Sequence, residues 1–487
     1  MKKLFCSLLF FLAVTSTELS AQLINTQQSH PNITRIVSQL AETRMILASS
    51  TGALCNGTAD DTNAIQTALN ELTAYSIQVG KYVNTTVVLP DGACRITHTL
   101  VMGLYGSLIG DNNATTLFAD YSAWQGNNYD ALDITINTQI PSEEAIANRR
   151  ISGFSLFGRN NSTVVSTGIK VYSTAPTAGT AVSDQLPYLS FDHLLISSFD
   201  TGIELDDVVA STIDTVNLSL VRCGVFINGN AVNVNMSHLQ IQYSTPLQTS
   251  ATKASSTGIL VTGRPYPNHA PAYPQGIILS DSDIVAFDYD LQINFCEICN
   301  FHDNILDYGG DGPQQSGATV WLGLIYGVTL RNNYIANTDT NGIGINVVNP
   351  SAVSQNSNND NIWIEGNYIT SYASNNSSTG ISLATGTNAS RGVHIENNHF
   401  RNLVQGISVN HPMTFSSIRG NYGDQITDWL INLNGSSGQS LPGLLIQGNW
   451  DSDSIPVVNV GSAAGFELEW NYSPAQATVA PNHLQQH

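Results

Sequence analysis

The sequence predicts an all-β protein built as a parallel β-helix, in which short strands wind into coils that stack on one another. Two observations carry this prediction. A segment with a central Asn recurs along the chain, as in IWIEGNYI (362–369), VHIENNHF (393–400) and LLIQGNW (444–450). Between these segments a second motif recurs, a Gly followed by alternating apolar residues, as in TGIEL (201–205) and TGILV (257–261). Alternation with a period of two is typical of half-buried strands.

The repeat can be followed by marking one position in each unit, the residue after its first apolar residue. Successive marks are often 22 or 23 residues apart, and the larger gaps, up to 43, indicate loop insertions. Such a unit contains two or three short strands and cannot bury its apolar side chains alone, so neighbouring units must stack. The marked residues are Ser152, Asp192, Asp214, Ser237, Ser280, His302, Arg331, Glu365, Glu396, Arg419, Gln447 and Glu469.

The recurring Asn and Gly residues are expected to be structural. Asn tolerates the left-handed backbone of a tight turn, and its amide can form hydrogen bonds from one coil to the next. The Gly before each alternating motif is expected where the chain bends sharply. The asparagines concerned are Asn333, Asn367, Asn398, Asn421, Asn449 and Asn471.

The two ends of the chain differ from the repeats. Residues 1–21 carry two lysines, an apolar run and small residues before Gln22, which indicates a secretory signal peptide. Residues 22–50 form an N-terminal segment with a short predicted helix, 51–475 the β-helix domain, and 476–487 a C-terminal tail. We expect a secreted or periplasmic protein.

Net charge narrows the class of partner. The formal charge of −20 becomes −21 when Lys2, Lys3 and Glu18 leave with the leader. This acidity argues against nucleic acid and anionic membranes, whose phosphates are neutralised by Lys and Arg. Few charged residues beside abundant Asn, Ser, Thr and Gly are typical of secreted proteins that handle sugars. A polysaccharide is therefore the expected partner, and the oligomeric state stays open, with a trimer among the alternatives.

Five cysteines remain after the leader, an odd number, so at least one is free or pairs between chains. Cys55 and Cys94 are candidates for a disulfide. Cys296 and Cys299 form a Cys-x-x-Cys pair, for which a disulfide or structural role is favoured over a metal half-site, since no second half-site follows at zinc spacing.

Residues 57–72, GTADDTNAIQTALNEL, and 85–112, TTVVLPDGACRITHTLVMGLYGSLIGDN, resemble the opening of the pectate-lyase-like superfamily. This resemblance implies a right-handed parallel β-helix (a solenoid) with an N-terminal capping helix. It implies that Asp61 or Thr62 caps that helix and that Cys94, standing where the family has an aromatic residue, pairs with Cys55. The buried stripe of the helix is expected at Ala64, Ile65, Ala68 and Leu69.

The resemblance is specific for the fold rather than for a reaction. DTGIELDD (200–207) and FDYDLQI (287–293) echo two polygalacturonase signatures loosely, and the remaining signatures of polygalacturonases and of classical pectate lyases are missing. The superfamily includes lyases, hydrolases, epimerases and non-catalytic spikes.

The family places its cleft on one strand face, between the longest inserted loops. Here these are 172–190, 243–256 and 263–276, and the last two flank the TGILV strand. The 263–276 loop is rich in proline and aromatics, so Tyr266 and Tyr273 are expected to stack on sugar rings. Arg264 and His269 in the same loop are expected to bind or protonate a sugar.

Paired carboxylates on this face predict the chemistry. Glu204 and Asp206 point to one side of their strand, about 6.6 Å apart by strand rise. This is the lower edge of the spacing in an inverting glycosidase, where one acid protonates the leaving group and one base activates water. Asp207 is assigned to either role. Alternatives are a solvated acidic strand end and a Ca²⁺ site. The neighbouring outward residues expected to contact substrate are Lys170, Tyr172 and Asn228.

Two further carboxylate sets are candidates. Asp288 and Asp290 have the same spacing and are expected near the other end of the groove. Asp192 and Asp214 lie 22 residues apart, hence on adjacent coils about 5 Å apart, which matches a retaining pair. Other polar residues are expected along the same face of the stack. For Arg331 and Glu365, pairing between coils is a simpler explanation than catalysis. The residues are His193, His302, Asp303, Arg331 and Glu365.

The sequence thus favours a secreted glycoside hydrolase acting through Glu204 and Asp206, with no cofactor expected unless Ca²⁺ binds. One alternative is a polysaccharide lyase acting on a uronate polymer by β-elimination. The other, from a different class, is a non-catalytic carbohydrate-binding or surface-attachment protein.

Overall fold

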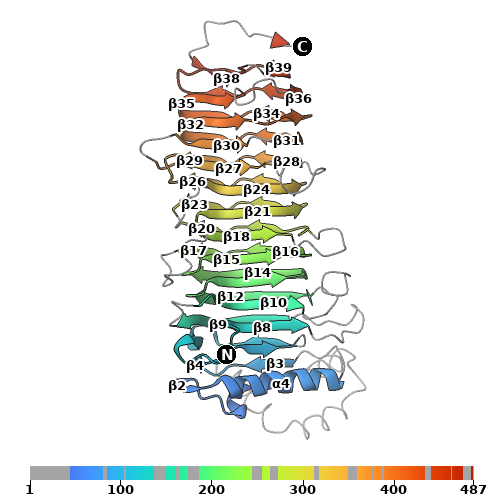
Figure 1. Cartoon of the computed structure of the whole chain (residues 1–487), viewed down its shortest axis with the longest axis vertical. Helices are drawn as coiled ribbons and strands as arrows, with labels where there is room; N and C mark the ends of the chain where they lie inside the picture. Colours follow the sequence, from blue (N-terminus) through green and yellow to red (C-terminus); the bar gives the residue numbers. More distant parts are fainter. Residues whose placement is uncertain are drawn as a thin grey trace, which may run out of the picture.

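A computed structural model of the chain describes residues 44–79, 85–103, 106–136, 149–159, 164–173, 186–243, 255–263, 273–311, 317–348, 359–373, 377–384, 389–433, 440–461, 463–474 and 484–485. These residues form a tall stack of parallel coils (Figure 1). The predicted right-handed parallel β-helix is confirmed. The signal peptide, and most of the segment expected at 22–50, lie outside the described residues.

Each coil contributes strands to three faces, and β9, β12, β14, β32 and β35 bend from one face into the next. The first face contains β1 (Arg44–Leu47), β3 (Thr85–Val88), β6 (Ser107–Ile109), β9 (Arg149–Arg159), β12 (Leu189–Ser197), β14 (Val208–Ser219), β16 (Val232–Ser237), β19 (Ile278–Ser280), β22 (Asn300–His302), β25 (Thr329–Arg331), β28 (Asp360–Glu365), β31 (Ser390–Glu396), β34 (Ser417–Arg419), β36 (Ser440–Gln447) and β39 (Ala464–Glu469).

The second face contains β2 (Asn56–Asp60), β4 (Gly92–Ile96), β7 (Thr115–Asp120), the ends of β9, β12 and β14, β17 (Gln240–Gln242), β20 (Asp283–Val285), β23 (Ile305–Gly309), β26 (Tyr334–Asn337), β29 (Tyr368–Ser371), the starts of β32 (His399–Val409) and β35 (Tyr422–Asn432), and β37 (Trp450–Asp451).

The third face contains β5 (Leu100–Met102), β8 (Asp130–Ile136), β10 (Thr167–Ser173), β13 (Thr201–Asp206), β15 (Cys223–Asn228), β18 (Thr257–Thr262), β21 (Tyr289–Glu297), β24 (Ala318–Tyr326), β27 (Ile343–Val347), β30 (Thr379–Leu383), the ends of β32 and β35, and β38 (Val458–Asn459).

Besides the strands of the three faces and one helix, the described residues form three further strands and three 3₁₀ turns. The strands are β11 (Leu186–Pro187), β33 (Met413–Thr414) and β40 (Leu484–Gln485), and β40 alone among the described strands pairs antiparallel, with β39. The turns are η1 (Ala48–Thr51), η2 (Asn112–Ala114) and η3 (Tyr121–Ala123).

The predicted register of the first face is confirmed. Every marked position pairs with the next one in the series, beginning with Ser152, Asp192 and Asp214 and ending with Gln447 and Glu469. On the third face the inward column Ile169, Ile203, Val225, Ile259 and Leu291 is fully buried. Stacked aliphatic side chains therefore fill the interior, and burial of this apolar area is the main stabilising contribution.

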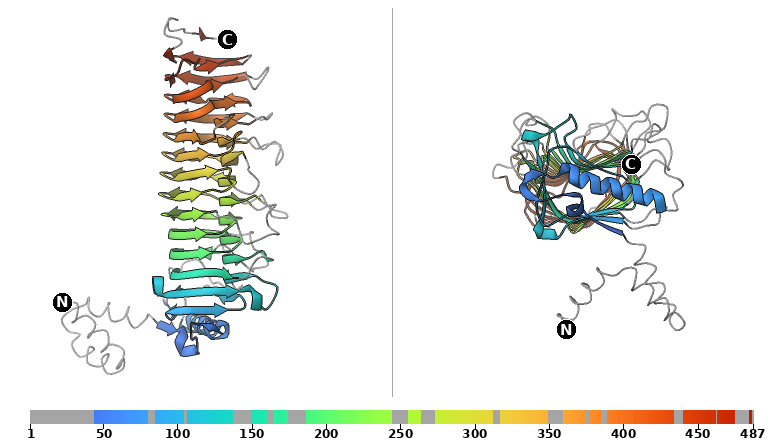
Figure 2. Two further views of the ribbon diagram at one scale, coloured as in Figure 1. Left: turned by 90° about the vertical axis from the view of Figure 1, so that its left-hand side faces the viewer. Right: turned by 90° about the horizontal axis from the view of Figure 1, so that it is seen from below.

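Helix α4 (Thr62–Val79) lies across the N-terminal end of the stack, as seen from below in Figure 2. It buries Ile65, Ala68 and Leu69, as predicted, whereas Ala64 is only partly buried. Asp61 does not cap the helix with its side chain. Its carboxylate accepts hydrogen bonds from the Leu54 and Arg95 amides instead, while Asp60 Oδ1 accepts from the Thr62 amide at 3.1 Å.

The asparagine ladder is confirmed, with one correction. Asn367 Nδ2 donates to Asn398 Oδ1 at 2.9 Å, and the same bond links the members before and after it, from Asn304 to Asn471. The left-handed backbone belongs to the residue before each of these asparagines, such as Asn332 (φ 55°) and Gly366 (φ 67°). The ladder Asn thus satisfies buried backbone groups of the turn rather than adopting its strained conformation.

The third-face glycines have a different role from the one predicted. Gly168, Gly202, Gly224 and Gly258 stack in one column and have no left-handed φ. A Cβ on Gly202 would lie 2.7 Å from the Gly224 carbonyl oxygen, and the other three meet backbone oxygens as closely. Close approach between coils, not a sharp bend, therefore requires glycine here.

Both cysteine pairs form disulfides, Cys55 with Cys94 and Cys296 with Cys299. The pairing implied by the family resemblance is thus confirmed, and the metal half-site alternative for Cys296 and Cys299 is disfavoured. Cys223 is unpaired and buried. No helix in the described part of the chain is long and apolar enough to cross a membrane.

Candidate functional site

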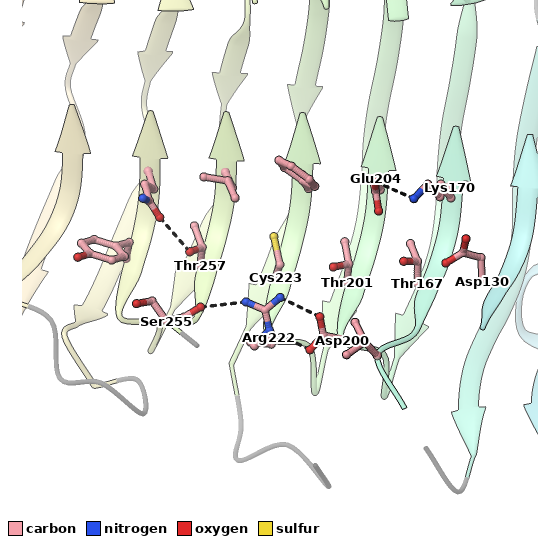
Figure 3. A pocket seen from close by; sticks show the side chains of 15 residues that line it. Asp130, Thr167, Lys170, Asp200, Thr201, Glu204, Arg222, Cys223, Ser255 and Thr257 are labelled. Carbon is pink, nitrogen blue, oxygen red and sulfur yellow. Dashed lines mark hydrogen bonds and ion pairs between the residues drawn. The ribbon is translucent and has the colours of Figure 1, made fainter. Parts of the chain in front are cut away.

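A cavity of about 550 Å³ opens on the third face, over the strands from β8 to β21. This volume lies in the range of small-molecule sites, about 300–1,000 Å³. Figure 3 shows its side chains in rows across adjacent strands, with Lys170 and Glu204 in one row and Thr167, Thr201, Cys223 and Thr257 in another. Residues of six successive coils therefore combine into one site, because the register places them side by side.

Glu204 and Lys170 are register partners, and they form an ion pair of 2.9 Å between Lys170 Nζ and Glu204 Oε1. Burial raises the pKa of Glu204, and although the Lys170 bond acts to lower it, the net pKa lies above the ordinary value. Burial acts to lower the pKa of Lys170, but the Glu204 bond and the neighbouring carboxylates outweigh it and raise it. Glu204 therefore holds a proton more readily than an exposed glutamate, while Lys170 stays cationic.

Asp206 follows two residues later on β13, which separates the two Cα atoms by about 6.6 Å. Its negative charge acts to raise the pKa of both Glu204 and Lys170, so it lies within electrostatic reach of this pair. Asp206 is 8% exposed and is not among the residues lining the cavity. It lies beside the cavity, at the next outward-pointing position of β13 after Glu204.

A second protonatable carboxyl, Asp133, adjoins the pair on β8. It is the register partner of Lys170 and accepts hydrogen bonds from Tyr172 Oη at 3.1 Å and Asn128 Nδ2 at 2.9 Å. Burial first, and then the negative charge of Asp130, raise its pKa to about 7. Asp133, Lys170 and Glu204 thus form one outward column in which a cation separates two carboxyls of raised pKa.

The edge of the cavity is fixed by Arg222. Its guanidinium donates two hydrogen bonds to Asp200, each of 2.8 Å, and a third to the Ser255 carbonyl at 3.0 Å. Bidentate pairing of this kind orients the group rigidly. The other end of the cavity is less polar, with Phe226, Leu260 and Tyr289 continuing the two rows. A ligand would meet charged groups at one end and an aromatic and aliphatic wall at the other.

Several predicted substrate residues lie near the cavity without lining it. Tyr172 turns its hydroxyl to Asp133, and its ring lies 5.7 Å from Lys170 Nζ. Asn228 is the register partner of Asp206 on the next coil. Tyr273 stacks on Phe295, with ring centroids 5.4 Å apart, so one face of its ring is covered. Arg264, Tyr266 and His269 lie outside the described residues.

The expected placement of Asp288 and Asp290 on the groove is wrong. Both side chains are fully buried. Asp288 accepts from the Ser256 amide at 2.7 Å, and Asp290 from the Phe287 amide at 3.3 Å. Asp290 pairs into the glycine column, at the crowded corner of the coil, where burial raises its pKa well above the ordinary value. Strand alternation predicts that Asp290 points outward, but at this corner an outward position is still buried.

Asp207 is a turn residue. It has a left-handed φ of 53°, is 2% exposed, and accepts a hydrogen bond from the Asn230 amide at 2.7 Å. These features tie the turn after β13 to the next coil, so its observed contacts are structural.

Sequence analysis missed Asp130 and Asp133 because their strand lacks the Gly. DALDI (130–134) aligns with TGIKV (167–171), with Ala131 in the place of Gly168. Allowing Ala at that position would have found both residues. Asp200 and Arg222 were missed because the residues just before each motif were not compared across coils.

The competing first-face pair carries ionised carboxylates. Asp192 and Asp214 are register partners, as predicted. Burial acts to raise the pKa of Asp192, but hydrogen bonds from Arg150, Ser152 and His193 outweigh it and lower the pKa to about 2. Hydrogen bonds from Ser237 and His238 lower the pKa of Asp214. Neither group is suited to donate a proton, which disfavours a retaining pair on this face.

The other polar residues predicted along this face also have structural contacts. His302 Nδ1 lies 2.8 Å from Asp303 Oδ2, and Arg331 is the register partner of both His302 and Glu365. Among the described residues, no group of three or more His, Cys, Asp or Glu side chains is arranged to hold a metal ion.

Solved structures of low sequence identity share this fold. The Pseudomonas phage phi297 tailspike gp61 superimposes with a TM-score of 0.61 at 10% identity, over 87% of this chain and 84% of the tailspike. DFA-IIIase from Arthrobacter chlorophenolicus A6, without its lid, gives 0.52 at 10% identity, over 77% and 94%. The catalytic unit of a GH87 alpha-1,3-glucanase from Streptomyces thermodiastaticus gives 0.50 at 13% identity, over 90% and 71%.

The chain shares the parallel β-helix fold of these structures. At these identities the likeness concerns the fold alone, and the share of the matched chain that is spanned runs from 61% to 99%. No protein-family model matches the sequence, and no curated protein matches it significantly. Function must therefore be argued from the cavity.

Proposed function

We propose that the protein is a secreted glycoside hydrolase that cleaves a polysaccharide at the third-face cavity. The observation that carries the proposal is the pairing of Glu204, a carboxyl of raised pKa on the cavity floor, with Asp206 beside it on the same strand. Two carboxyls of different environment on one strand face are the minimum equipment of an inverting glycosidase. A GH87 alpha-1,3-glucanase shares the fold, so this scaffold supports polysaccharide hydrolysis.

In the proposed reaction Glu204, protonated, donates its proton to the glycosidic oxygen as the bond from that oxygen to the anomeric carbon breaks. The Asp206 carboxylate takes a proton from a water molecule, whose oxygen attacks the anomeric carbon from the opposite side. The products are a sugar hemiacetal of inverted configuration and an alcohol, and the two carboxyls then exchange protons with solvent. Lys170 Nζ, 2.9 Å from Glu204 Oε1, holds the carboxyl in position: it donates a hydrogen bond to this oxygen while the carboxyl is protonated, and forms an ion pair with it once the proton has left.

The alternative of a β-eliminating lyase is less well supported. A lyase needs a neutral base beside the uronate, and Lys170, the cavity lysine, has a raised pKa that keeps it protonated. Arg222 is engaged by Asp200 and the Ser255 carbonyl. The chemistry of the cavity therefore favours acid catalysis over proton abstraction by a cationic residue.

The test is a screen of the purified protein against neutral and uronic polysaccharides, with the Glu204→Gln variant as the inactive reference. New reducing ends without ultraviolet absorbance from an unsaturated sugar are expected. Proton NMR of the first products is expected to show inversion at the anomeric carbon. Unsaturated products would establish the lyase instead, and binding without turnover of any polymer would favour the non-catalytic alternative.

A further inference from the structure

A second pocket, of about 480 Å³, lies on the second face, nearer the C-terminal end of the stack than the third-face cavity. It spans β26, β29, β32 and β35, in the yellow to orange part of Figure 1, whereas the cavity spans the blue-green to yellow-green coils. We call it the tyrosine pocket. Its lining residues are Tyr334, Tyr368, Thr370, Ser371, Tyr372, Arg401, Asn402 and Gln425.

Its aromatic wall is held rigid by ring contacts. Tyr334 and Tyr368 are register partners whose rings stack with centroids 5.5 Å apart and planes 7° apart. They belong to a column of rings that continues through His399, Tyr422 and Trp450 by edge-to-face and tilted contacts. This column stabilises the coils, and it accounts for Tyr334 and Tyr368 without any ligand.

Tyr372 is not explained by that column. It follows the end of β29 and is 48% exposed, yet its hydroxyl forms a short hydrogen bond with the Tyr334 hydroxyl. Its ring also contacts Tyr308, with centroids 5.2 Å apart. An aromatic ring that is both exposed and fixed loses little entropy when a ligand packs against it.

The polar wall is fixed as well. Arg401 pairs with Thr370 across the coils, and a hydrogen bond to Tyr368 is the main cause that raises its pKa. Its Nε lies 3.5 Å from Asp424 Oδ2, which offsets its charge. Asn402 and Gln425 sit in left-handed turns, at φ 52° and 58°, and Asn402 Nδ2 donates to the Ser371 carbonyl. The pocket thus presents amides, hydroxyls and one guanidinium that lies beside a carboxylate.

This combination identifies the class of ligand. Phenol rings pack on the C–H faces of sugars, and planar amides, hydroxyls and guanidinium groups bind vicinal hydroxyls. An apolar ligand would leave these polar groups unsatisfied, and a phosphate would meet a single cation with the Asp424 carboxylate beside it. We propose that the tyrosine pocket is a carbohydrate-binding site, separate from the cavity, that holds a short stretch of glycan without cleaving it.

Binding by the turnover-free Glu204→Gln variant tests this site independently of the catalytic proposal. The probes are cellotetraose, maltotetraose, galactotetraose and tetragalacturonate, titrated by calorimetry. At least one is expected to bind, and Tyr372→Ala and Arg401→Gln, each added to Glu204→Gln, are expected to weaken it about tenfold or more. The matched control is Tyr326→Ala, which removes an equally exposed tyrosine (49%) on another face.

Two outcomes would overturn the proposal. One is that no probe binds the Glu204→Gln variant. The other is binding that Tyr372→Ala and Arg401→Gln leave unchanged, which would place the sugar elsewhere. Tyr372→Phe provides a milder variant, because it removes only the hydroxyl bond to Tyr334 and keeps the ring. If the protein hydrolyses no polysaccharide but still binds a glycan at the tyrosine pocket, only the catalytic proposal is contradicted.

Discussion

Two faces of the same stack carry carboxylates with basic partners, and their environments shift the pKa values of these carboxyls in opposite directions. On the first face Asp192 is surrounded by donors from Arg150, Ser152 and His193, and its pKa falls to about 2. On the third face Glu204 has a single basic partner, Lys170, and burial raises its pKa. Because coil stacking repeats the same spacing everywhere, spacing does not identify a catalytic pair. The number of hydrogen-bond donors around each carboxyl distinguishes the faces.

The largest expected effect contrasts two glutamates of similar exposure. Glu204→Gln removes the proposed acid and is expected to reduce kcat about 100- to 10,000-fold, the usual contribution of a general acid. Glu396, on the first face, is likewise mostly buried and paired with a cation, Arg419, at 2.7 Å. Glu396→Gln is expected to leave kcat near that of the unaltered protein while lowering Tm. Equal kcat losses in the two variants would remove the distinction between the faces.

The next effect is on stability, and its sign differs between the faces. The pKa of Asp133 is raised to about 7, from 3.8, so the folded state binds its proton more tightly than the unfolded state does. Its contribution to stability is present below pH about 4 and is lost as pH rises toward 7, about 2–4 kcal/mol in total. Denaturant melts of Asp133→Asn across this range should show a smaller loss with rising pH than the unaltered protein.

Asp192 has the opposite linkage. Its folded pKa of about 2 lies below 3.8, so its stabilising contribution is present above pH about 4 and is lost as pH falls toward 2. The size is about 1 kcal/mol once solvent screening is allowed for. Asp192→Asn should therefore flatten the acid limb of the stability curve. If both variants changed the same limb, the assigned protonation states would be wrong.

The smallest effect is a shift in the pH profile. Lys170 acts to lower the pKa of Glu204, so Lys170→Met is expected to raise that pKa. Because the reaction needs protonated Glu204, the basic limb of kcat against pH is expected to move to higher pH. Arg150→Met on the first face is the matched control and should leave the limb in place. A downward shift in Lys170→Met would contradict the acid role.

The fold was predictable because every coil buries the same pattern of apolar side chains. The spacing of marked residues from Ser152 to Glu469 gave the observed register, since each coil must place an apolar residue over the one before it. The asparagine ladder followed from the same repeat, although the left-handed residue is its neighbour, such as Asn332.

The site was predictable only in part. Lys170 and Glu204 were found because they occupy the outward position of a recognised motif, and they do meet across the coils. Asp290 was misplaced because strand alternation predicts that it points outward. It lies at a crowded corner of the coil, where the neighbouring chain buries it. One of the donors to Asp192 is Arg150, a residue 42 positions away, and periodicity does not specify which side chains turn toward each other.

The most direct test of the central claim is the ionisation of Glu204 itself. Carbon-13 NMR of labelled glutamate carboxyls, with the Glu204 signal assigned by its loss in Glu204→Gln, gives the pKa in the intact protein. The expected result is a pKa above the ordinary glutamate value of 4.5 that rises further in Lys170→Met. A Glu204 pKa at or below 4.5 would mean that the third face holds an ionised carboxylate, as the first face does, and would contradict the account.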